Sequence, residues 1–150
     1  MDRFYRRNLP HWREEHGTPA YFVTWRLARG QAALTDGERD VVADALRHFD
    51  GRRYQLIGFV VMDDHVHVVV VPRAGERLER LLHSWKSFTS HRFCRHGERR
   101  PPMWQDEYFD RLLRTDGELD EKLEYITGNP WKRWSNLKAY RWVWPPAVAR

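Results

Sequence analysis

Alternating apolar and polar positions predict four strands along this chain. The first covers residues 20–28, where one face carries Tyr21, Val23, Trp25 and Leu27, because successive side chains of a strand point to opposite sides of a sheet. Two apolar runs follow at residues 54–62 and 65–72. The two aspartates at 63–64 join them, and a two-residue link of this kind predicts a tight hairpin. A weaker alternation over residues 107–114 predicts the fourth strand.

Apolar residues at helical spacing lie between these strands. Residues 35–49 begin with a capping Thr or Asp and carry an apolar stripe, which predicts a helix. Residues 75–97 repeat the pattern and end at a glycine, a common helix stop. Residues 115–130 start with a Thr-Asp cap and acidic first-turn residues, and the closing Gly-Asn-Pro predicts the helix end.

The element order β-α-β-β-α-β-α predicts the fold. It is typical of an α+β protein with a ferredoxin-like antiparallel sheet and helices packed on one face. The length of 150 residues predicts a single domain over residues 1–150. Within it we expect a basic N-terminal arm at residues 1–19 and a C-terminal extension at residues 131–150.

Positive charge is the main compositional bias. Lys and Arg number 26 against 21 Asp and Glu, a formal net charge of +5, and most of the cations are arginines. Arginine binds phosphate bidentately, so the bias favours a nucleic-acid partner. An ordinary solvated basic surface explains the same charge, so the charge alone does not decide.

Composition also excludes several classes of protein. The hydrophobic fraction of 41% and charged fraction of 31% are typical of a soluble globular chain. Cys94 is the single cysteine, which excludes an internal disulfide and a thiolate zinc site. The longest near-apolar stretch, residues 56–62, is too short to cross a membrane. We therefore expect a cytoplasmic protein with no membrane partner.

The second strand of the hairpin carries the first candidate chemistry. His65 and His67 are two residues apart in an apolar strand, so both imidazoles point to one face. They are either a hydrogen-bonded core pair or two ligands of a metal site. The pair alone leaves both interpretations open.

The last helix offers a third ligand and a nucleophile. Tyr125 and Asn129 are four residues apart and share one helical face. An amide or carboxylate oxygen beside the two histidines predicts an Mg²⁺ or Mn²⁺ site with open positions. Tyr125 would then be a nucleophile beside a polarised phosphate, whereas a lone helical tyrosine is more often a packing residue.

Four ordered motifs carry a family resemblance. They read VVMDDHVHVVVVP, LLHSWKSFTSHRF, WQDEYFDRLLR and EYITGNP. Together they resemble the REP-associated tyrosine transposases, IS200-like members of the single-tyrosine HUH (His-hydrophobe-His) superfamily. The resemblance covers roughly residues 5–132, and it implies the ferredoxin-like HUH transposase fold.

The resemblance also implies roles for individual residues and a reaction. His65 and His67 match the metal pair, Tyr125 the nucleophile, and Asn129 the position that completes the metal site. The implied reaction, a step in DNA transposition and recombination, cleaves and rejoins single-stranded DNA through a 5′-phosphotyrosine link. The implied substrate is a REP-like palindromic hairpin with a guide tetranucleotide, which would associate the protein with the nucleoid.

Three stretches depart from the family pattern. The usual MPNH, or a similar sequence, that leads into the HUH pair reads MDDH here, which adds Asp63 and Asp64 beside the metal pair. The usual VKAGL after the Asn-Pro pair reads WKRWSNL, and the C-terminal residues 139–146 match only loosely. The last two departures concern DNA preference rather than the class of reaction.

Basic residues near these motifs are candidates for DNA contacts, with a solvated surface as the alternative. We predict contacts from Arg6, Arg7, Lys86, Arg92, Arg111, Arg114 and Lys132.

Two other functions fit parts of the sequence. The first is a domesticated protein that binds DNA hairpins without productive catalysis. The second is a small zinc hydrolase that uses His65, His67 and either Asp63 or Asp64, whose activity would not need Tyr125. The oligomeric state is left open between a monomer and a homodimer.

Overall fold

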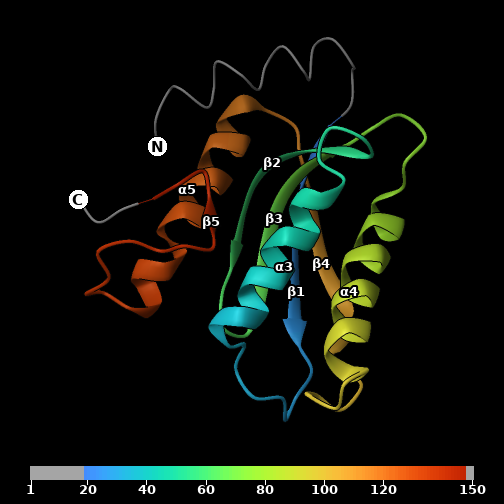
Figure 1. The fold of residues 1–150 in the computed structure, drawn as a ribbon. Helices are drawn as coiled ribbons and strands as arrows, with labels where there is room; N and C mark the ends of the chain where they lie inside the picture. The colour runs from blue at the N-terminus through green and yellow to red at the C-terminus, as the bar shows by residue number, and fades with distance from the viewer. Residues whose placement is uncertain (1–18, 148–150) are drawn as a thin grey trace.

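The computed structural model describes residues 19–147, which form one five-stranded sheet and three helices (Figure 1). In chain order the elements are β1 (Ala20–Leu27), α3 (Asp36–His48), β2 (Tyr54–Val61), β3 (His65–Pro72), α4 (Leu78–Cys94), β4 (Trp104–Leu113), α5 (Asp116–Arg133) and β5 (Val143–Trp144). The strand order is β4-β1-β3-β2-β5, and each neighbouring pair is antiparallel. The predicted α+β class with an antiparallel sheet is confirmed. The predicted arm lies outside the described residues, apart from its last residue.

The helices cover both faces of the sheet, so one part of the prediction is wrong. As predicted, α3 and α4 lie side by side on one face (Figure 1) and share a core with Val66, Val68 and Val70 of β3. Helix α5 instead packs on the opposite face, against Val69 and Val71. The physical reason lies in β3, which is apolar at consecutive positions and buried along its whole length. A strand of this kind needs a cover on both sides.

The end of α5 also differs from the prediction. The helix does not stop at the Gly-Asn-Pro sequence but continues through Pro130 to Arg133. Proline removes one helical hydrogen bond, but Asn129 and Pro130 are buried and the backbone N–H of Trp134 donates to the Pro130 carbonyl at 2.8 Å. Residues 131–133 of the expected C-terminal extension therefore belong to α5. The short strand β5 lies in that extension and was not predicted.

No helix in the described part of the chain is long and apolar enough to span a membrane.

A glycine in β2 lets α5 approach the sheet closely. The β2–β3 register shifts between Leu56 and Gly58, which indicates a bulge. A Cβ atom at position 58 would lie 2.7 Å from Leu123 Cδ2 of α5 and 2.9 Å from the Trp144 carbonyl oxygen. No side chain fits there without moving α5 or β5.

We expect Gly58→Ala to lower the free energy of unfolding by about 1–3 kcal/mol, because the added methyl group overpacks this contact. Chemical denaturation measures the change. Gly37→Ala is the matched control, since a Cβ at that position in the first turn of α3 would point into open space. That control should be neutral or stabilising by up to about 1 kcal/mol. Equal effects of the two substitutions would contradict the close approach.

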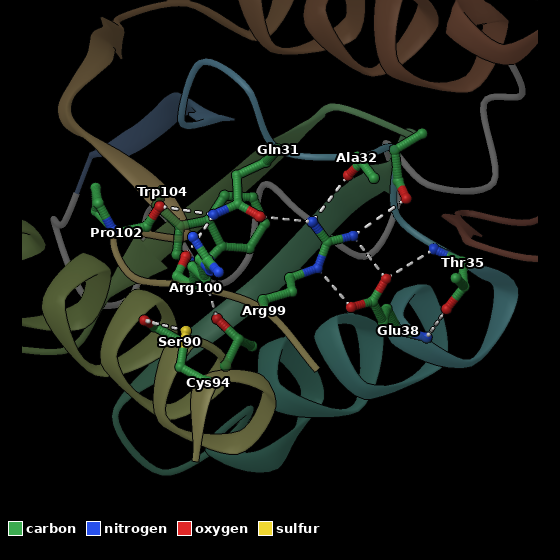
Figure 2. Close-up of polar contacts among 12 residues, drawn as sticks. Gln31, Ala32, Thr35, Glu38, Ser90, Cys94, Arg99, Arg100, Pro102 and Trp104 are labelled. Atoms are coloured by element: carbon green, nitrogen blue, oxygen red, sulfur yellow. Dashed lines mark hydrogen bonds and ion pairs between the residues drawn. The ribbon is translucent and has the colours of Figure 1, made fainter. Parts of the chain in front are cut away.

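A buried ion pair joins α3 to the loop before β4 (Figure 2). Arg99 Nε and Nη2 donate to the two carboxylate oxygens of Glu38 at 2.6 and 2.7 Å, and both side chains are almost fully buried. The same guanidinium donates to Gln31 Oε1 and to the carbonyls of Ala32 and Ala33. Glu38 in turn accepts from the N–H of Thr35 at 2.9 Å and closes a capping box.

The contacts of Glu38 with Arg99 and Thr35 make the stability of the fold fall at acid pH. Burial raises the pKa of Glu38, but the hydrogen bonds and charge of Arg99 and the contacts with Thr35 outweigh it, so the pKa lies below its usual 4.5. The unfolded chain then binds a proton before the folded one does. Stability from Glu38 is present above about pH 4.5 and falls as the pH drops further.

We expect Glu38→Gln to flatten the fall in the free energy of unfolding below about pH 4.5. Denaturation series between pH 3 and 7 provide the measurement. Arg99→Met should lose roughly 3–5 kcal/mol at pH 7, because it leaves a buried carboxylate without its partner, and should recover part of this loss in acid. An unchanged acid slope in Glu38→Gln would show that other groups set it.

Candidate active site

The two histidines of β3 lie on the face covered by α5. His65 is 7% exposed and His67 is 3% exposed, and their ring centroids are 4.6 Å apart. In the antiparallel register with β1, Thr24 lies opposite His67 and Arg26 lies opposite His65. The predicted placement of both rings on one face is therefore found in the structure.

His67 is neutral, and one of its ring nitrogens is buried without a hydrogen-bond partner in the described structure. Its Nδ1 lies 2.6 Å from the Thr24 hydroxyl, and its ring stacks on Phe22 at 5.3 Å. Burial lowers the pKa of His67 to about 3, helped by electrostatic repulsion from His65, Arg26 and Lys122. Its Nε2 is buried and has no hydrogen-bond partner among residues 19–147. A buried polar atom without a partner lowers the stability of the fold unless a ligand binds it.

His65 is oriented by the residue before it. Its Nδ1 lies 2.6 Å from Asp64 Oδ1. Burial raises the pKa of Asp64, but the hydrogen bond from His65 and the charge of Arg133 outweigh it and keep the pKa low. An ionised carboxylate only accepts hydrogen bonds, so Nδ1 of His65 carries the proton. In the neutral ring Nε2 is then the free ligand atom, as in carboxylate–histidine–metal arrangements.

Tyr125 lies next to this pair at the surface. Its ring centroid is 5.3 Å from that of His67 and 6.0 Å from that of Phe22, and the residue is 37% exposed. Two ammonium groups stand over the same ring, Lys132 Nζ at 4.7 Å and Lys122 Nζ at 5.6 Å from its centroid. The tyrosine is thus open to a large ligand, and the surrounding charge is positive.

Asn129 lies one helical turn after Tyr125. It is 8% exposed, and its Oδ1 is buried without a hydrogen-bond partner within the described ranges. Tyr125 and Arg133, four residues to either side, contact His67 and the carboxylate that holds His65. Residues at this spacing share a helical face, so Asn129 faces the histidine strand between these two contacts.

The donor set fits a divalent metal ion, with an amide as the third ligand. No group of three or more His, Cys, Asp and Glu side chains able to hold a metal occurs in residues 19–147. Two of the buried side-chain atoms without hydrogen-bond partners in residues 19–147 are His67 Nε2, a nitrogen donor, and Asn129 Oδ1, an oxygen donor. Together with His65 they match the mixed ligands that Mn²⁺ and Mg²⁺ accept.

The predicted DNA contacts lie at different places. Lys132 stands over Tyr125, and Arg111 of β4 lies opposite Phe22 of β1 on the histidine face. Lys86 Nζ donates to the carbonyls of Gln105 and Asp106 at 2.7 and 3.2 Å, and burial lowers its pKa.

Of the remaining predicted contacts, Arg92 and Arg114 lie within the described residues. Arg92 lines an apolar groove of about 470 Å³ between α3 and α4, behind the sheet. Arg114 is exposed after the end of β4, and Arg6 and Arg7 lie outside the described residues. These DNA contacts all stay predictions.

Several residues of the site were missed from the sequence. Lys122 lies three residues before Tyr125, and that helical spacing was a usable signal. Thr24 alternates with buried Val23 and Trp25 on β1, but only the strand register reveals its contact with His67. Arg133 was hidden because the helix was expected to stop before it.

The comparison with protein families identifies the chain. A family model described as IS200-like transposase matches residues 20–129, which include the histidines, the tyrosine and Asn129. The chain belongs to the IS200-like transposase family. The predicted IS200-like classification is thereby confirmed, and with it the coarse prediction of a DNA-acting, transposase-like protein. The comparison with curated proteins gives no match.

Two solved structures are similar in fold to this chain. The first is a REP-associated tyrosine transposase bound to a REP hairpin, with a TM-score of 0.67, 16% identity, and coverage of 84% of this chain and 76% of the other. The second is a predicted transposase from Deinococcus radiodurans R1, with a TM-score of 0.54, 18% identity, and coverage of 71% and 87%. At these identities the likeness concerns the fold.

We expect Thr24→Val to weaken Mn²⁺ binding by about 10–100-fold, because the partner that orients a ligating histidine is lost. Isothermal titration with Mn²⁺ measures the affinity. Thr127→Val is the matched control, since Thr127 is half-buried in α5 and its hydroxyl bonds only helix carbonyls. Equal affinities in the two variants would show that the Thr24 hydroxyl does not position His67.

Proposed function

We propose that this protein is a metal-dependent single-stranded DNA endonuclease and strand transferase that acts on REP-type hairpins through a phosphotyrosine intermediate. One observation carries the proposal. An exposed tyrosine ring lies against a histidine whose buried Nε2 has no partner in the described structure, one helical turn from an amide oxygen in the same condition. A candidate nucleophile therefore lies beside two donor atoms that have no hydrogen-bond partner in the described structure.

The chain's own residues can carry out both halves of the reaction. In cleavage the Tyr125 oxygen forms a bond to the scissile phosphorus, the bond from phosphorus to the 3′ oxygen breaks, and the phenolic proton ends on the released 3′-OH. In joining, a 3′-OH displaces the tyrosine and the proton returns to it. Lys122 and Lys132 stand over the Tyr125 ring and offset the negative charge that develops there.

A divalent ion is the expected cofactor, Mg²⁺ or Mn²⁺. We assign His65, His67 and Asn129 as its ligands. When bound it would act as a Lewis acid on the phosphate oxygens. The neutral state of His67 and the Asp64-oriented His65 leave nitrogen lone pairs for this purpose.

The surface around Tyr125 suits an unpaired strand of DNA. Phe109 of β4 is 57% exposed and lies edge-on to Phe22, 6.4 Å away between ring centroids. Arg111 is exposed on the same strand. Exposed aromatic rings beside cations bind single strands by stacking and charge. The likeness to a transposase bound to a REP hairpin supports a hairpin as the partner.

The zinc-hydrolase alternative is less favoured. It needs Asp63 or Asp64 as a ligand, and both carboxylates are engaged by Arg133, at 2.8 and 3.2 Å. The remaining alternative, a hairpin-binding protein without productive catalysis, keeps the DNA surface and differs only in the reaction of Tyr125.

We expect Tyr125→Phe to abolish a covalent protein–DNA adduct while leaving DNA binding within a few-fold of the unaltered protein, because only the attacking oxygen is removed. The assay incubates the protein with end-labelled single-stranded hairpins from the host's own repeats and Mn²⁺ or Mg²⁺. Denaturing gels detect the adduct, and gel shifts measure binding.

Tyr108→Phe is the matched control. Tyr108 is 39% exposed, close to the value for Tyr125, but lies opposite Trp25 of β1 on the face covered by α3 and α4. It should form the adduct normally. Adduct formation by Tyr125→Phe would exclude Tyr125 as the nucleophile, and binding without any adduct in the unaltered protein would favour the non-catalytic alternative.

A further inference from the structure

The last turn of α5 is tied to the β2–β3 turn by three charged side chains. Arg133 Nη1 lies 2.8 and 2.9 Å from the two carboxylate oxygens of Asp63, and its Nη2 lies 3.2 Å from Asp64 Oδ1. A planar guanidinium that spans two carboxylates fixes direction as well as distance. This cluster holds the end of the helix at the base of the histidine strand.

The contact continues into the metal-ligand pair. Asp64 Oδ1 accepts from Arg133 and also from Nδ1 of His65. An unbroken series of polar contacts therefore runs from α5 to the first histidine of β3. The same carboxylate oxygen orients the imidazole and anchors the helix.

The apolar contacts of α5 lie on both sides of Asn129, but such contacts are non-directional. Leu119, Leu123 and Ile126 bury the helix on the sheet before Asn129, and Trp131 packs against the same core after it. Tyr125, Asn129 and Arg133 recur every four residues on one face, about 6 Å apart along the axis. A bond at Arg133 and a ring contact at Tyr125 fix both ends of the segment that carries Asn129.

We propose that Arg133 is a positioning residue that, with Asp63 and Asp64, forms a latch holding Tyr125 and Asn129 over the histidine pair. The inference deepens the proposed function and rests on it. It also accounts for two departures from the family pattern, since the acidic pair of MDDH and the arginine of WKRWSNL contact each other. The arginine also offsets part of the negative charge of the two carboxylates beside the histidine pair.

The experiment compares Arg133→Met with the matched control Arg141→Met in the full chain. Arg141 also lies after Pro130 and pairs with one carboxylate, Asp40 Oδ1 at 2.9 Å, but in α3. The readouts are backbone hydrogen exchange of residues 124–134, Mn²⁺ affinity by titration, and the midpoint of unfolding. Arg133→Lys tests whether charge without bidentate geometry is enough.

We expect Arg133→Met to speed exchange over residues 124–134 roughly two- to five-fold, as for loss of an exposed ion pair. Mn²⁺ binding should weaken about 10-fold or more because an outer partner of the ligands is lost. Arg141→Met should change neither, and both variants should unfold at similar midpoints. Arg133→Lys should restore only part of the Mn²⁺ affinity. Asp63→Asn should add nothing to Arg133→Met, because both remove one contact.

Two results would overturn the latch. One is exchange in α5 that is the same in Arg133→Met and Arg141→Met. The other is faster exchange with unchanged Mn²⁺ affinity, which would mean that the contact stabilises the helix without placing Asn129. If the unaltered protein binds no Mn²⁺, the metal part of the proposed function fails, and equal exchange in the two arginine variants would still overturn the latch.

Discussion

β3 is the central strand of the sheet, and it is buried on both faces along its whole length. Its valines point alternately toward α3 and α4 and toward α5. A strand like this is stable only when both sides are covered, so α5 must lie across the face that also carries His65 and His67. The burial that stabilises the sheet thus brings the tyrosine helix to the histidines.

The same burial sets the chemical state of the site. His67 loses its charge because it is removed from water, and the low pKa of Asp64 makes its carboxylate an acceptor that fixes the ring of His65. Cations surround the two rings, with Lys122 and Lys132 over Tyr125 and Arg26 opposite His65. Imidazole donors with a positive rim are suited to a metal ion and a phosphate at once.

The sequence predicted the parts of the site that depend on local periodicity. The two histidines share a face because a strand repeats every two residues, and Tyr125 and Asn129 share a face because a helix repeats every 3.6. Contacts between different elements could not be predicted from local periodicity. The Thr24–His67 bond depends on strand register, and Arg133 reaches Asp63 only because buried contacts carry α5 past Pro130. The consecutive valines of β3 indicate a strand that is covered on both faces, which predicts a helix on each side of the sheet. The order of the elements alone favoured helices on one face.

The double-sided sheet has a consequence for how this protein can change over evolution. The surface formed by α3 and α4, including the groove beside Phe88 and Arg92, is separated from Tyr125 by the full thickness of the sheet. Substitutions at well-separated sites act independently. Exposed positions of that rear surface, such as Phe88 and Arg92, can therefore change without touching the reactive side chains, whereas buried Trp85 in the same groove helps to cover the sheet that carries them.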